Sequence, residues 1–373
     1  MHADVKSPLA TPLRLVPPPQ ARYSSETSGT YVAHEESGRP PEAPVAERPS
    51  PSIGRRIASF WLKALFFTSE RATWIPLSMT GLVRRGVLMF APNVRHATMA
   101  NAARILGPDS TEGHRTALAR GVVESFFRFC IDVGRSAHMT PEQLLGEIAS
   151  VEGREHYDRA RASGKGLIIA TAHMGSFEVG LSGLAMQGQQ LHVIFQRDEQ
   201  GLFERQRSSL RERLNINESP IDNGWTMWIS LRDALLRGEA VVMQADRVMP
   251  GQRGQKVPFL HGHLEMPPGP AKLARLSGAW IVPIFSIRRP DGRINLFIEP
   301  PITPADDVEE PAASAPTIGT RRVDPLLRKL SLVIQKYVRA YPEQWLMFHP
   351  AFCEDQPATS NPTRLPEKDK PRA

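Results

Sequence analysis

The stretch "GLIIATAHMGSFEVG" (residues 166–180) is the strongest indication of the fold class in this sequence. Its uninterrupted apolar run over 166–172 is typical of a buried strand, and His173 follows that run directly. Gly175 tolerates a tight backbone and Ser176 is a natural first residue of a helix, so we expect a bend there. A helical pattern over 177–187 comes next. The stretch therefore predicts a strand, a short loop and a helix.

The same alternation continues along the rest of the chain. Further β-rich runs and helical patterns follow one another, and a final amphipathic helix is expected at 324–342. The expected strands are 191–196, 240–245, 280–287 and 294–299, and the expected helices are 201–214, 225–237 and 268–277. Strands that alternate with helices predict an α/β fold with a mainly parallel central sheet flanked by helices.

The regions on either side of this core have a different composition. Residues 93–148 are helical in pattern, so 53–148 is predicted to be a helical N-terminal segment packed on, or leading into, a core at 149–353. Residues 1–52 and 354–373 are rich in proline and polar residues and cannot bury enough apolar area to offset their conformational entropy. We expect two disordered tails. The first has no hydrophobic segment of signal-peptide type, so export is not expected.

The segment 55–67 is both basic and aromatic. Its apolar run is shorter than the ~20 residues that span a bilayer and is interrupted by Lys63, so we expect no transmembrane helix. A helix lying in the membrane interface would have this composition. An ordinary amphipathic helix packed on the domain would have it too, and both interpretations stay open.

The excess of positive charge lies in the middle of the chain. Of the net charge of +7, residues 1–52 contribute −1 and residues 354–373 contribute 0, which leaves +8 for residues 53–353. Such a balance favours a polyanionic partner: nucleic acid, an anionic membrane surface or an acidic protein. Nucleic-acid binding is the weakest of these, because the sequence contains none of the usual nucleic-acid-binding signatures.

His173 and Glu178 are the first candidates for chemistry. In α/β folds reactive groups collect beyond the carboxyl ends of strands, where His173 is expected. With His173 in the loop and Glu178 on the first helical turn, the carboxylate could accept a hydrogen bond from one imidazole nitrogen and leave the other as a free base. Such a pair suits the removal of a proton from a substrate hydroxyl.

Other kinds of chemistry find little support. No G-x-S-x-G motif occurs, and Ser176 lies too close to His173 in sequence to be an obvious nucleophile. Cys130 and Cys353 lie in apolar segments and are expected to be core thiols. The pair in "HGH" (261–263) has no nearby third ligand and is expected to lie in a polar hairpin, so we expect no metal site.

Three segments together resemble a known family. They are "GKGLIIATAHMGSFEVG", "QADRVMPGQRGQKVPFLHGHLEMPPGPAKLARLSGAWIVPIF" and "PEQWLMFHPAF", which in order and spacing are similar to the bacterial lipid A biosynthesis (lauroyl/myristoyl) acyltransferases. That family lies within the lysophospholipid acyltransferase superfamily. The resemblance covers roughly residues 95–353 and excludes both tails.

The resemblance implies roles for particular residues. The family's catalytic H-x4-D/E motif falls on His173 and Glu178. Arg197, Arg211, Asp246 and Gly175 are the substrate-binding candidates. Arg211 could instead belong to a solvated helix face, and Asp246 could be structural through a pair with its neighbour in sequence.

The resemblance also implies a reaction. A fatty acyl chain passes from a thioester on acyl carrier protein or coenzyme A, with the carrier protein favoured, to a hydroxyl of a membrane lipid or glycolipid, as in lipid A and lipopolysaccharide biosynthesis. No cofactor is expected beyond this co-substrate. The expected location is the cytoplasmic face of the bacterial inner membrane, with peripheral or interfacial attachment to its anionic surface, because the hydrophobic N-terminal anchor usual in the family is missing here. An acyl-CoA-dependent lysophospholipid or glycerolipid acyltransferase and a lipid hydrolase are the alternatives.

Overall fold

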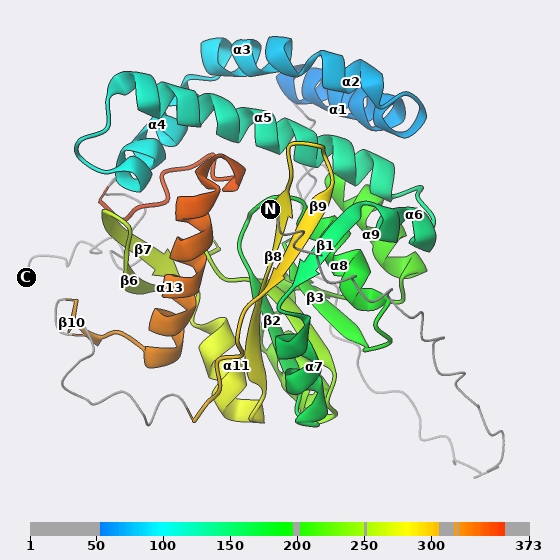
Figure 1. Ribbon diagram of the computed structural model, residues 1–373, viewed down its shortest axis with the longest axis vertical. Helices are drawn as coiled ribbons and strands as arrows, with labels where there is room; N and C mark the ends of the chain where they lie inside the picture. Colours follow the sequence, from blue (N-terminus) through cyan, green and yellow to red (C-terminus); the bar gives the residue numbers. More distant parts are fainter. Residues whose placement is uncertain (1–52, 197–201, 250–251, 306–316, 319–320, 355–373) are drawn as a thin grey trace, which may run out of the picture.

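The computed structural model describes residues 53–196, 202–249, 252–305, 317–318 and 321–354 of the 373-residue chain. Both predicted tails fall almost wholly outside these ranges, as does Arg197. A seven-stranded sheet forms the centre, with helices on both faces and a helical layer across one end (Figure 1). The prediction of an α/β fold with a mainly parallel sheet is confirmed.

The sheet has the strand order β1-β9-β8-β2-β5-β3-β4. Its members are β1 (Ile148–Glu152), β2 (Leu167–Thr171), β3 (Leu191–Phe195), β4 (Asn217–Pro220), β5 (Ala240–Gln244), β8 (Trp280–Arg288) and β9 (Ile294–Ile298). Only the β8–β9 pair is antiparallel. β2 is completely buried and lies between β8 and β5, so the carboxyl ends of β2 and β5 are neighbours.

Two sets of helices cover the faces of the sheet because alternate strand residues point to opposite sides. Leu167 and Ile169 of β2 pack in one cluster with α7 and α8, whereas Ile168 and Ala170 pack in the other with α10, α11 and α13. The bounds are α7 (Arg154–Ala162), α8 (Phe177–Ala185), α9 (Leu202–Arg213), α10 (Gly224–Leu236), α11 (Gly269–Ser277) and α13 (Pro325–Ala340). Short 3-10 turns precede α10 (η1, Ile221–Asn223) and follow α13 (η2, Pro342–Gln344).

The N-terminal segment forms the end layer that Figure 1 shows at the top. Its helices are α1 (Ile53–Arg71), α2 (Trp74–Ser78), α3 (Thr80–Phe90), α4 (Pro92–Leu106), α5 (Glu112–Ser136) and α6 (Pro141–Gly146). The long helix α5 is the base on which α1, α3 and α4 pack. None of the helices in the described residues is both long and apolar enough to cross a membrane. The division of the chain into a helical segment at 53–148 and a core at 149–353 stays a prediction.

Two small antiparallel pairs stand apart from the central sheet. They are β6–β7 (Gln255–Phe259 and Gly262–Met266) and β10–β11 (Thr317–Ile318 and Arg321–Arg322). The "HGH" sequence lies at the β6–β7 turn, so the predicted hairpin is confirmed. His263 is paired there with Glu354, Nδ1 to Oε1 at 2.5 Å.

Candidate active site

His173 is fixed in the loop that follows β2. Its imidazole Nδ1 lies 2.7 Å from Oδ1 of Asp246, and its backbone N–H donates to Oδ2 of the same carboxylate at 2.9 Å. Asp246 follows β5 as His173 follows β2, and the parallel pairing of these strands brings the two residues together. The site therefore lies at the carboxyl edge of the sheet, as predicted.

Asp246 is completely buried and is held by a third donor. The indole N–H of Trp345 donates to Oδ2 at 2.9 Å. Burial alone would raise the pKa of this carboxyl, but the charge of His173 and the hydrogen bonds from the imidazole, the indole and the His173 backbone outweigh it. The pKa of Asp246 is therefore lowered and the group is ionised, so it can only accept hydrogen bonds. Nδ1 of His173 then carries the hydrogen, and Nε2 is the basic nitrogen.

Glu178 is not the partner of His173, so the predicted pairing is wrong. Its carboxylate, 1% exposed, accepts a hydrogen bond from Arg211 (NH2 to Oε1, 2.9 Å) and forms an ion pair with Arg207 (Nε to Oε1, 3.0 Å). No hydrogen bond or ion pair joins it to His173 in the described structure. The physical reason is that α9 supplies two guanidinium groups to Glu178, while the segment after β5 supplies the carboxylate of Asp246 to the imidazole.

Arg211 lies at the centre of this buried network. It donates to Glu178 and also to Glu218 (NH1 to Oε1, 3.0 Å), and its side chain is 3% exposed. The alternative of a solvated helix face is therefore wrong. Arg207 lies beside it, with its guanidinium within 5.8 Å of the ring centres of Phe129, Phe177 and Phe203. The two arginines and the two glutamates balance in charge.

The bend at Gly175 and Ser176 is confirmed and is held by three elements. Gly175 has φ +56° and its N–H donates to the carbonyl oxygen of Gln344. Ser176 occupies the N-cap position of α8, but its hydroxyl does not cap the helix; it donates to buried Asp132 (2.7 Å), which Arg288 also contacts. These contacts fix the loop that carries His173. Gly175 is therefore a structural residue of the turn.

His173 lies on the wall of a cavity of about 910 Å³. One part of this wall continues the core between the sheet and α8. It consists of Ile169, Leu181, Leu184, Val193 and Ile284. Phe177 also lines the cavity, and its ring stacks on that of Phe129 with the ring centres 4.9 Å apart.

The other part of the wall is more polar and basic. It comprises Trp225, Trp228 and Arg232 of α10, Lys272 of α11, and Arg247 and Arg253 of the loop after β5. With Arg207 and Arg211, six cationic side chains line the cavity, and no carboxylate does so among the residues that the structure describes. Arg247 has no ion pair with Asp246 there; its guanidinium is near the sulfur of Met249. The idea of an Asp246–Arg247 pair is therefore wrong.

Three residues of the site were not singled out from the sequence. Trp345 and His349 lie in the segment "PEQWLMFHPAF", which contributed to the resemblance only as a block. Arg207 was one arginine in a basic helix. Burial, together with the charges of Arg247 and His173, lowers the pKa of His349 to about 4, and the charge of Asp246 opposes this shift. His349 is therefore a neutral cavity residue near pH 7.

The cysteines take no part in the site. Burial raises the pKa of Cys130 to about 12 and that of Cys353 to about 11, and neither residue lines the cavity. In the described part of the chain, no three His, Cys, Asp or Glu side chains are grouped to hold a metal ion. Of the residues that line the cavity, His173 is the candidate base.

Comparisons with known proteins confirm the resemblance. The bacterial lipid A biosynthesis acyltransferase family matches residues 54–354. The lipid A biosynthesis lauroyltransferase of Escherichia coli K12 is 26% identical over 249 residues, 66% of this chain and 74% of that protein. Two phosphatidylinositol mannoside acyltransferases of Mycobacterium tuberculosis are 28% and 27% identical over 191 residues, 49% of this chain and 58% of theirs. The chain therefore belongs to the bacterial lipid A biosynthesis acyltransferase family and is an O-acyltransferase that acts on a lipid or glycolipid.

Proposed function

We propose that the enzyme transfers a fatty acyl chain from an acyl thioester, with acyl carrier protein as the favoured carrier, to a hydroxyl of a lipid A-type glycolipid. The observation that supports this most directly is that His173, held by Asp246, lies on the wall of a cavity lined by both apolar and cationic side chains. The lauroyltransferase of Escherichia coli, which matches over most of its length, favours this acceptor.

His173 is the proposed general base. Nε2 takes the proton of the acceptor hydroxyl while the oxygen attacks the thioester carbonyl, and Asp246 stabilises the imidazolium that forms. When the tetrahedral intermediate collapses, the carbon–sulfur bond breaks and the imidazolium returns the proton to the leaving thiolate. The products are an ester and a free thiol, and His173 is again neutral. This sequence requires no metal or redox cofactor.

Glu178 has a positioning role in this proposal. It neutralises Arg211 and Arg207 inside the protein and so ties α9 to the first turn of α8, directly after the His173 loop. Arg211 is a substrate-binding candidate from the sequence, but both of its terminal nitrogens already donate to Glu178 and Glu218. We therefore assign Arg211 to the same positioning network.

The two parts of the cavity suit the two ends of the substrates. Ile169, Leu184 and Val193 line the part that extends into the apolar core, which is the place for the fatty chain. Arg247 and Arg253 line another part of the cavity, where a guanidinium fork can bind the phosphate of phosphopantetheine or of the acceptor headgroup. Arg197, the remaining candidate for this role, lies outside the described residues.

The charge of residues 53–353 supports the proposed partners. A net charge of +8 suits an acidic carrier protein and an anionic membrane surface. We place the enzyme at the cytoplasmic face of the inner membrane, attached peripherally or at the interface.

The test combines donors, acceptors and one variant. Purified enzyme is given matched acyl carrier protein and acyl-CoA donors with lipid A precursors, and the products are identified by lipid mass spectrometry. We expect an acylated glycolipid, a clear preference for the carrier-protein donor, and no product from folded His173→Ala. Equal use of acyl-CoA with a lysophospholipid acceptor would favour the glycerolipid alternative. Free fatty acid as the sole product would favour a hydrolase.

The mannoside acyltransferases support a second acceptor class. They match over 58% of their length, and their acceptor is a mannosylated phosphatidylinositol. A phosphatidylinositol mannoside is therefore included as an acceptor in the same experiment. Acylation of this lipid alone would change the acceptor and leave the His173 chemistry intact.

A further inference from the structure

The outer face of α1, α2 and α3 is unusually apolar for a protein surface. Fifteen large hydrophobic side chains are exposed in the described structure, and nine of them lie between residues 60 and 90. These nine are Phe60, Trp61, Phe67, Trp74, Leu77, Met79, Leu82, Met89 and Phe90. The most exposed are Phe90 (77%) and Trp74 (72%). A patch of this size on a protein surface indicates an interaction site.

The helices turn this face away from the protein. On α1, Phe66 and Ser69 are buried toward α5, and Phe60 and Phe67 lie on the opposite side of the helix. α3 also packs on α5, and its exposed Leu82 and Met89 are seven residues apart and so share one face. Figure 1 shows α1, α2 and α3 as the outermost layer at this end of the molecule.

The charge of this segment matches an anionic surface. Residues 53–90 contain six arginines or lysines and one acidic residue, Glu70. Aromatic side chains among basic residues on one side of a helix are typical of helices that lie in the membrane interface. An apolar protein partner would not require this excess of positive charge.

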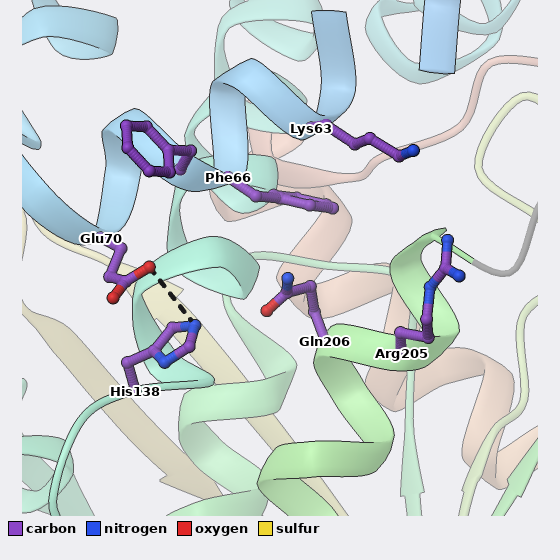
Figure 2. A pocket seen from close by; sticks show the side chains of 7 residues that line it. Lys63, Phe66, Glu70, His138, Arg205 and Gln206 are labelled. Carbon is purple, nitrogen blue, oxygen red and sulfur yellow. Dashed lines mark ion pairs between the residues drawn. The ribbon is translucent and has the colours of Figure 1, made fainter. Parts of the chain in front are cut away.

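A pocket of about 320 Å³ opens at the edge of this face, between α1 and α9. It is lined by Lys63, Phe66, Phe67, Glu70, His138, Arg205 and Gln206. Figure 2 shows the side chains of Lys63 and Arg205 extending toward the same end of the pocket, from α1 and from α9. The one carboxylate in the lining, that of Glu70, lies at the other end and is paired with His138 (Oε2 to Nε2, 3.5 Å).

We propose that α1, α2 and α3 form the surface by which the enzyme docks on an anionic bilayer, and that Lys63 and Arg205 bind a lipid phosphate in the pocket at its edge. The apolar side chains enter the region between headgroups and acyl chains, and the two cations meet the phosphates above it. This inference rests on the membrane attachment proposed above but not on the chemistry of the cavity.

The first experiment is sedimentation of the full-length protein with vesicles. We expect binding to vesicles of phosphatidylcholine and phosphatidylglycerol, much weaker binding to phosphatidylcholine alone, and a decrease with added salt. Equal binding to both vesicle types, or no binding, would overturn the proposal.

Charge variants test the pocket. Lys63→Gln and Arg205→Gln should each lower the partition coefficient for anionic vesicles about fivefold, from ~1 kcal/mol per cation near the surface. The matched control is Arg159→Gln, at an exposed arginine of α7, and this variant should bind as the unmodified protein does. Figure 1 shows α7 at the end of the molecule away from α1, α2 and α3. A loss of the same size in the control would mean that net charge alone acts, and the pocket would have no role.

Apolar variants test the face itself. Trp74→Ser and Leu82→Ser should each lower binding by about tenfold or more, since a large apolar side chain contributes at least ~1.5 kcal/mol on full burial. The control is Leu332→Ser on α13, another exposed leucine. Light scattering of the protein without lipid tests whether the face instead binds a second copy of the chain. A dimer that dissociates on Leu82→Ser would show that it does and would overturn the proposal.

A final comparison separates this inference from the acyl transfer. His173→Ala should bind vesicles normally, and the double variant Lys63→Gln, Arg205→Gln should transfer acyl groups normally to a detergent-dispersed acceptor. If the protein does not bind vesicles as expected but still transfers acyl groups, the docking surface is wrong and the proposed acyl transfer is unaffected.

Discussion

Asp246 holds His173 through both of its carboxylate oxygens, one on the imidazole Nδ1 and one on the backbone N–H. The two residues are 73 positions apart in the chain. The double contact fixes the position of the ring as well as its tautomer, and it leaves Nε2 as the nitrogen that can act as a base.

The first prediction concerns this carboxylate. Asp246→Asn removes the negative charge that stabilises the imidazolium, so kcat should decrease about 10²- to 10⁴-fold with little change in KM, the range for loss of a positioned acid–base group. Steady-state kinetics provide the measurement.

The control for this prediction is Trp345→Phe, which removes one hydrogen bond to Asp246 but keeps the charge. A tenfold loss or less is expected. A folded Asp246→Asn enzyme with normal kcat would show that the imidazole does not need this partner.

The second prediction concerns Glu178. Glu178→Gln leaves Arg211 and Arg207 without their buried counter-charge, so the free energy of unfolding should decrease by about 3–5 kcal/mol. Activity should decrease as α9 shifts. Denaturant titration measures the stability.

Glu218→Gln is the matched change in the same network. The Glu218 side chain is 27% exposed, so water can solvate Arg211 in part when the carboxylate charge is removed, and a smaller loss of stability is expected. If Glu178→Gln were as stable as the unmodified enzyme and yet inactive, Glu178 would have a direct chemical role.

The third prediction concerns the bend before α8. Gly175→Ala places a side chain at φ +56°, which costs about 1–2 kcal/mol, and the new methyl group would overlap the carbonyl oxygen of Ser286. Both the melting temperature and kcat should decrease because the His173 loop must move. Gly188→Ala is the control, since its φ of +74° carries the same strain but no atom lies within 4 Å of the added group. Equal effects of the two substitutions would contradict a close fit at Gly175.

The fourth prediction concerns the pH dependence of stability. The pKa of His349 is about 4 in the folded protein and ordinarily 6.5. Between these values the unfolded chain binds a proton that the folded protein does not, so the free energy of unfolding should rise with pH, by at most about 1.4 kcal/mol per pH unit. The contribution is complete above pH 6.5 and is lost as the pH falls toward 4.

His349→Asn isolates this contribution. Denaturant titrations of both proteins between pH 4 and 7 should show a shallower pH dependence in the variant. Parallel curves would mean that His349 titrates alike in the folded and unfolded states.

Much of the architecture was predictable because its signals are local. The apolar run before His173 and the Gly175–Ser176 bend each depend on neighbouring residues, and both occur as expected. The edge strands β1 and β4 were not predicted. They are short, partly exposed segments whose strand conformation depends on pairing with β9 and β3.

The partners of the charged residues could not be predicted in this way. The spacing suggested Glu178 for His173, but two arginines on α9 take that carboxylate and Asp246 takes the imidazole. Which carboxylate meets which cation depends on where β5 and α9 lie relative to β2. No sequence spacing contains that information.

Local sequence signals were enough to predict an alternating strand–helix chain with a histidine at the end of a buried strand, because apolar periodicity and turn residues act over a few positions. The tertiary structure alone decided that Asp246 completes the pair, that Glu178 and Arg211 form a buried network, and that nine large apolar side chains of residues 60–90 remain exposed. The reason is physical. Strand order and helix packing set the contacts between distant residues, and those depend on the burial of the whole core.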